Sequence, residues 1–172
     1  MKKKLVFPVA VATILVIAAT FTFFYIEKNK FSNVSDLSLH IIDGDKLKLS
    51  SLKGKPVLVT FWATTCSTCV KEIPHLAKLY QELGNDIFEI VAIAMPYDPP
   101  NLVVSMAEKT NIPYPVALDI QGDAVKAFGD VLVTPTSFLI DTQGNIVEEH
   151  KGELDIQAFK QKVKKLHKTT VS

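Results

Sequence analysis

The residues of this chain best suited to chemistry are its two cysteines, Cys66 and Cys69. They follow an apolar run ending at Trp62 and precede apolar residues at helical spacing, so they are expected where a strand becomes a helix. The free N–H groups and dipole of a helix N-terminus would stabilise a thiolate at Cys66. Cys69 would lie one turn further on, close enough to form a disulfide with Cys66. The pattern predicts thiol–disulfide exchange, with Cys66 attacking and Cys69 resolving the mixed disulfide.

Other uses of two cysteines fit this spacing less well. A structural disulfide closing so short a loop would constrain the unfolded chain little. Covalent haem attachment needs a histidine after the second cysteine, where Val70 stands. A zinc site needs four ligands, and the four histidines are scattered: His40, His75, His150 and His167. We therefore expect no metal and no cofactor.

The segments around the cysteines indicate how the pair is positioned. Residues 56–62 and 88–95 are apolar runs, typical of strands buried on both faces of a sheet. Apolar residues between these runs recur at helical spacing as far as Gly84, which suits a helix end. Strands separated by helices favour a parallel central sheet with helices on both faces.

The remaining segments complete an α/β domain with a mixed sheet. Alternating apolar residues on either side of Asp43-Gly44 predict an initial hairpin over 37–49. The turn formers of 141–145 predict that the last two strands are antiparallel. The other expected elements are a turn or short helix at 50–54, helical stretches at 102–109 and 124–128, strands at 116–118 and 136–140, and a closing helix over 156–166.

The N-terminus carries a candidate membrane anchor. Lys2, Lys3 and Lys4 precede the uncharged stretch 5–26, which as a helix spans roughly 33 Å, enough for a hydrocarbon core of about 30 Å. A cleaved signal peptide is less favoured, because its apolar region is usually shorter, although Ala18 and Ala19 leave weak cleavage options. The leading lysines place the N-terminus in the cytoplasm and the domain outside. We expect a transmembrane segment with flanks at 1–30, a linker at 31–36 and one domain at 37–172.

The charge of the domain excludes one class of partner. From Phe31 onward 17 carboxylates outnumber 14 lysines, and the chain contains no arginine. No basic surface for nucleic acid is implied.

The cysteine segment also resembles a known family. Residues 57–69, VLVTFWATTCSTC, are similar to the active-site strand and motif of thioredoxins. The closer likeness is to membrane-tethered TlpA/ResA/DsbE-type proteins, which share KEIP at 71–74 and a segment like TPTSFLID at 134–141. This resemblance covers 37–167. It implies a thioredoxin-like fold and an extracytoplasmic or periplasmic oxidoreductase that reduces protein disulfides, takes electrons from a transmembrane thiol reductase and serves cytochrome c maturation.

The resemblance also implies further site residues. Trp62 corresponds to the tryptophan beside the redox pair, where it could shield the disulfide and pack on partners; plain core packing is the alternative. Thr134-Pro135 corresponds to a cis-proline loop that faces the cysteines and offers its backbone to an extended substrate. Because X–Pro bonds are mostly trans, only the resemblance carries the cis assignment. A proline that merely starts a strand is the alternative.

One departure from the family concerns the proton acceptor for Cys69. Thioredoxins carry a buried aspartate where this chain has Thr60, and the resemblance implies for ResA-like relatives a glutamate near the end of the second core strand, which is absent here. Asp98 is the nearest candidate, although a solvated loop carboxylate is the favoured interpretation. Glu89 begins the same strand and is expected at an exposed end.

Two other functions use a related fold. A peroxiredoxin-like peroxidase would need a threonine where Ala63 stands, and an arginine, which the chain lacks. A copper-delivery module would separate its cysteines by three residues rather than two and would add a histidine ligand. No histidine is tied to the Pro135 region by sequence.

Overall fold

The computed structural model describes residues 13–22, 34–84 and 86–171. The chain divides into two compact units, Met1–Ser32 and Asn33–Ser172. In the first unit, residues 13–22 are helical. Within the three described ranges, no helix combines the length and apolarity that crossing a membrane requires. The expected span 5–26 and linker 31–36 both extend outside the described residues.

The second unit alternates strands and helices as expected. Its elements are η1 (Val34–Asp36), β1 (Ser38–Ile41), β2 (Lys46–Lys48), η2 (Leu49–Leu52), β3 (Val57–Trp62), α2 (Ser67–Leu83), β4 (Glu89–Ala94), α3 (Pro100–Thr110), β5 (Val116–Leu118), α4 (Asp123–Ala127), β6 (Thr136–Ile140), β7 (Ile146–Lys151) and α5 (Ile156–Val171). Each predicted element is present, with ends shifted by a few residues.

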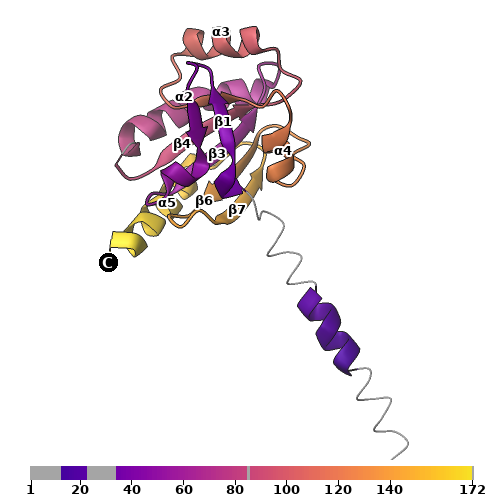
Figure 1. The fold of residues 1–172 in the computed structure, drawn as a ribbon. Helices are drawn as coiled ribbons and strands as arrows, with labels where there is room; N and C mark the ends of the chain where they lie inside the picture. The colour runs from indigo at the N-terminus through magenta and orange to yellow at the C-terminus, as the bar shows by residue number, and fades with distance from the viewer. Residues whose placement is uncertain (1–12, 23–33, 85, 172) are drawn as a thin grey trace, which may run out of the picture. The chain divides into compact units, whose positions relative to one another are not determined.

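The strands form one seven-stranded sheet in the order β2-β1-β5-β4-β3-β6-β7. Figure 1 labels β1, β3, β4, β6 and β7 of this sheet. The central strands β3, β4 and β5 are parallel, while β1, β2, β6 and β7 pair antiparallel with their neighbours. The mixed sheet, the initial hairpin and the antiparallel last pair are therefore confirmed. Since β3 lies near the centre, the cysteines that follow it stand at the carboxyl edge of the parallel strands.

Alternation along β3 sends side chains to two separate cores. Leu58 and Trp62 join a cluster with residues of α2, α3 and α5, such as Leu76. Phe61 points to the opposite face, where its ring lies 5.3 Å from that of Phe128 at the end of α4. Each fully buried phenylalanine or leucine contributes roughly 1.5–3 kcal/mol. Helices thus cover both faces of the sheet and hold β3 and its C-terminal loop in place.

Gly84 ends the helix that begins at the cysteines, as predicted. Its N–H donates to the carbonyl oxygen of Tyr80 at 2.6 Å. A Cβ atom at this position would lie 2.4 Å from that oxygen, so only glycine allows so close a turn.

Candidate active site

Cys66 and Cys69 are joined by a disulfide at the start of α2. Cys66 is the N-cap residue of that helix, and the Cα atoms of the two cysteines are 5.2 Å apart. The backbone N–H of Cys69 donates to Sγ of Cys66 at 3.2 Å. The first turn of the helix therefore directs a free N–H donor at the Cys66 sulfur, which favours a thiolate there when the pair is reduced.

The two sulfurs differ in accessibility. Cys66 is half-buried at the strand-to-helix turn, whereas Cys69 is 3% exposed. A protein substrate approaching from solvent can reach Cys66 directly. Cys69 can act only on the mixed disulfide that has already formed between Cys66 and the substrate. This arrangement suits Cys66 as the attacking thiol and Cys69 as the resolving thiol.

The Thr134-Pro135 loop lies next to the end of β3, the strand that leads into the cysteine turn. The Thr134–Pro135 peptide bond is cis, as the resemblance implied. Phe61 of β3 pairs with Thr136 of β6, so continuing this antiparallel register places Pro135 next to Trp62. Pro135 is buried, but Leu132, three residues earlier, is 86% exposed. The loop thus runs past the end of β3 and exposes an apolar side chain at Leu132.

Trp62 lies inside the core rather than on the surface. It is 3% exposed and lines a small cavity together with Cys69. Almost none of its ring is left for contact with a partner, so its position suits shielding of the disulfide from within.

Glu72 is a further functional candidate, which the sequence indicates only as part of the KEIP segment at 71–74. It lies one turn after Cys69 on α2, is 2% exposed, and its Oε1 accepts a hydrogen bond from the N–H of Leu154 at 2.7 Å. Burial raises the pKa of the Glu72 carboxyl above its usual value, an effect that the Leu154 N–H opposes. A glutamate three residues after Cys69 on an apolar helix stripe was the signal that could have revealed it.

The cavity beside the redox pair connects Glu72 with Cys69. Its volume is about 10 Å³, room for about one water molecule, and Thr60 and Tyr114 also line it. The Thr60 hydroxyl accepts a hydrogen bond from Ser137 at 3.0 Å. Burial raises the pKa of the Tyr114 hydroxyl, and the negative charge of Glu72 raises it further by a smaller amount. Glu72 is therefore the ionisable carboxylate that shares an enclosed space with the resolving cysteine.

Asp98 is not the solvated loop carboxylate that was the favoured interpretation; that expectation was wrong. The residue is 4% exposed. Its Oδ2 accepts the backbone N–H of Thr64 and its Oδ1 accepts the Thr64 hydroxyl, both at 2.6 Å. The carboxylate is buried because Thr64, just before the cysteines, supplies two donors in place of water.

Glu89 also differs from its expected exposed position. It is buried at the start of β4, and Lys55 forms an ion pair with it at 3.4 Å. The Tyr80 side chain contacts the same carboxylate. These two neighbours cover it, and neither belongs to the cysteine turn.

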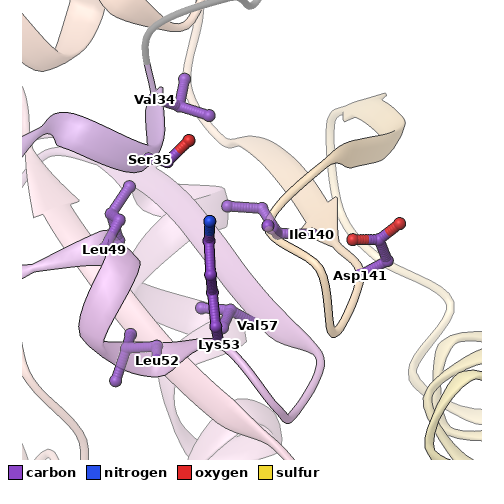
Figure 2. Close-up of a pocket in the computed structure, with 9 residues that line it drawn as sticks. Val34, Ser35, Leu49, Leu52, Lys53, Val57, Ile140 and Asp141 are labelled. Carbon is purple, nitrogen blue, oxygen red and sulfur yellow. The ribbon is translucent and has the colours of Figure 1, made fainter. Parts of the chain in front are cut away.

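A second small cavity lies away from the cysteines. Figure 2 shows it between η1, η2 and the end of β6, with Lys53 and Val57 among its lining residues. Val57 begins β3, whereas the redox pair follows the other end of that strand. In the part of the chain that the structure describes, no three histidine, cysteine, aspartate or glutamate side chains are grouped so that they could hold a metal ion.

Comparisons with known proteins agree with this geometry. The Redoxin family model matches residues 27–166. The thiol-disulfide oxidoreductase ResA of Bacillus thuringiensis subsp. konkukian is 33% identical, over 96% of this chain and 98% of its own length. ResA of Bacillus subtilis is 30% identical, over 89% and 88%. The crystal structure of a thiol:disulfide interchange protein of the thioredoxin family from Chlorobium tepidum aligns with a TM-score of 0.70 at 30% identity, covering 76% of this chain and 92% of that one.

Proposed function

This chain belongs to the Redoxin family and is a thiol–disulfide oxidoreductase of the ResA type, and we propose that it works outside the cytoplasm as a reductant of protein disulfides. The observation that carries the proposal is the asymmetric pair at the start of α2, in which Cys66 is half-buried and Cys69 is buried. Thiol–disulfide exchange needs an accessible first sulfur and a sheltered second one, and this pair supplies both; the likeness to ResA favours the reducing direction.

In the first step, the Cys66 thiolate attacks one sulfur of the substrate disulfide. A bond forms between Cys66 Sγ and that sulfur, and the substrate disulfide breaks, releasing the other substrate sulfur as a thiolate. The N–H of Cys69 and the start of α2 stabilise the Cys66 thiolate before the attack.

In the second step, Cys69 attacks Cys66 Sγ and releases the reduced substrate. The two electrons leave the cysteine pair, which becomes the disulfide seen in the structure. Cys69 must lose a proton first, and Glu72 is positioned to accept it through the shared cavity. We assign this role to Glu72 rather than to Asp98, because both oxygens of Asp98 already accept hydrogen bonds from Thr64.

The substrate contacts that we propose lie on the Thr134-Pro135 loop. Backbone groups of Thr134 and Pro135 would pair with an extended substrate segment, while the exposed Leu132 would add an apolar contact. The Trp62 ring would exclude water from the side of the disulfide that faces the core.

The membrane anchor at 5–26 belongs to the same proposal. Its support is the uncharged stretch behind three lysines, which would leave the domain on the outer face. Each turnover consumes two electrons, and Cys66 and Cys69 are the only cysteines of the chain. A transmembrane thiol reductase would therefore re-reduce the pair. The family likeness favours the disulfide of apocytochrome c as a substrate, because its two cysteines must be reduced to thiols before haem attachment.

Labelling of intact cells tests anchoring, orientation and direction together. A membrane-impermeant maleimide should modify the cysteine pair without lysis, and the protein should stay in the membrane pellet after an alkaline carbonate wash. The Cys66→Ser/Cys69→Ser double variant is the control, since it has no cysteine to label. Release of the protein by carbonate would contradict the membrane anchor. Labelling that appears only after lysis would contradict the outward orientation of the domain. Labelling only after an external reductant is added would contradict the reductant role.

A further inference from the structure

The loop between β4 and α3 is tied to the turn that carries Cys66. Asp98 lies in that loop, and its own N–H donates to the carbonyl of Met95 at 2.9 Å. Its two carboxylate oxygens accept the two donors of Thr64, which is 34 residues away in sequence and two residues before Cys66.

The tether fixes the conformation of the cysteine turn. Hydrogen bonds to an ionised carboxylate are shorter and stronger than neutral ones, and two of them converge on one residue here. Thr64 follows Ala63, whose carbonyl accepts the N–H of Cys66 at 3.0 Å. Thr64 lies inside this Ala63–Cys66 turn, so holding Thr64 restricts the backbone that sets the direction of the Cys66 sulfur.

The tether also places a negative charge against Thr64, two residues before the reactive thiol of Cys66. Asp98 is buried, and none of the ion pairs among the described residues includes it. A negative charge bonded to Thr64, two residues before Cys66, disfavours the Cys66 thiolate. It opposes the stabilisation of that thiolate by the N-terminus of α2. A less stable thiolate makes the dithiol form less stable and the pair more reducing.

We infer that Asp98 is a positioning residue that holds the Cys66 turn through Thr64, and that its buried charge makes the cysteine pair more reducing. The inference rests on Cys66 being the attacking thiol in the proposed function. It assigns to Asp98 no contact with substrate and no proton transfer.

Two substitutions in the full-length protein separate charge from positioning. Asp98→Asn removes the charge and leaves an oxygen to accept the Thr64 N–H. We expect about a threefold to tenfold shift of the glutathione equilibrium toward the dithiol, where tenfold is about 30 mV, and alkylation of Cys66 at lower pH. Thr64→Val keeps the charge and removes the hydroxyl donor. We expect the equilibrium to stay within about twofold of wild type while the rate of disulfide reduction falls about threefold to tenfold.

Two further variants serve as controls. Thr64→Ser keeps both donors and should restore the rate. Asp119→Asn replaces another buried carboxylate, which accepts the N–H groups of Ala124 and Val125 at the start of α4 and does not touch the cysteine turn. It should destabilise the fold without a comparable shift of the equilibrium.

The results decide each part separately. A shift in Asp98→Asn no larger than that in Asp119→Asn would overturn the role of the charge. A Thr64→Val protein as fast as Thr64→Ser would overturn the positioning role. A wild-type pair poised as an oxidant would contradict the proposed reductant but not this inference, since every shift is measured relative to wild type.

Discussion

Cys69→Ser should accumulate mixed disulfides between Cys66 and protein substrates, whereas Cys66→Ser should accumulate none. The half-buried Cys66 can still attack a substrate when Cys69 is a serine, but no second thiol remains to release it. In Cys66→Ser the buried Cys69 is the only thiol, and a substrate disulfide cannot reach it. Acid-quenched cells run on non-reducing gels, with and without dithiothreitol, would show the captured species. Both variants should lose all turnover.

The reverse pattern would contradict the assigned roles. Capture by Cys66→Ser alone would make Cys69 the attacking thiol. The double variant controls for association without a disulfide, because any band it retains cannot depend on sulfur.

Glu72→Gln should slow release of the mixed disulfide by about 100-fold while leaving the first attack nearly unchanged, since a general base typically contributes 10²–10⁴-fold. An amide fills the same volume and can still accept the Leu154 N–H, but it cannot take the proton of Cys69. Quenched-flow measurement of the mixed-disulfide lifetime would separate the two steps. Equal lifetimes in the variant and the wild type would remove Glu72 from the mechanism.

The same substitution should change stability with a definite pH dependence. Because burial raises the pKa of Glu72 in the folded state, its stability contribution is fully present below the unfolded value of 4.5 and is lost as pH rises through the folded value. Glu72→Gln should therefore match wild type near pH 4 and unfold at a higher temperature at pH 8. Each pKa unit corresponds to about 1.36 kcal/mol, or roughly 3 °C for a domain of this size.

Glu82 on the same helix provides a matched control. It is exposed, and its hydrogen bond with Lys160 lowers the pKa of its carboxyl. Glu82→Gln should leave the unfolding temperature at pH 8 nearly unchanged, because exposed ion pairs contribute little. An equal rise in both variants would show that burial of Glu72 is not the cause.

The elements that position the cysteines could be predicted from local sequence patterns. The apolar run 56–62 and the helical stripe ending at Gly84 predicted Cys66 at a strand-to-helix turn, and the structure has it there. Such patterns act over a few residues and are visible without knowledge of the packing.

The burial of the two carboxylates could not be predicted in the same way. Glu72 is buried by contact with Leu154, 82 residues further along the chain, and Asp98 by contact with Thr64 across 34 residues. An isolated acidic residue is usually exposed, and only the assembled fold shows that donors are present to replace water.

The position of Glu72 offers a physical account of Thr60. Thioredoxins resemble this chain but carry an aspartate at that strand position. Here the hydroxyl of Thr60 and the carboxylate of Glu72 line the same cavity beside Cys69, one from β3 and one from α2. A carboxylate on the helix can serve the buried sulfur as well as one on the strand, since both face the same enclosed space.

The reduction potential of the Cys66–Cys69 pair tests the central claim most directly. The full-length protein would be equilibrated with glutathione and dithiothreitol buffers, and the thiols counted by alkylation. A reductant that depends on a dedicated electron donor should give a value near or below about −250 mV. A value near −120 mV would mark an oxidant, and a pair that never forms the disulfide would contradict the redox role itself.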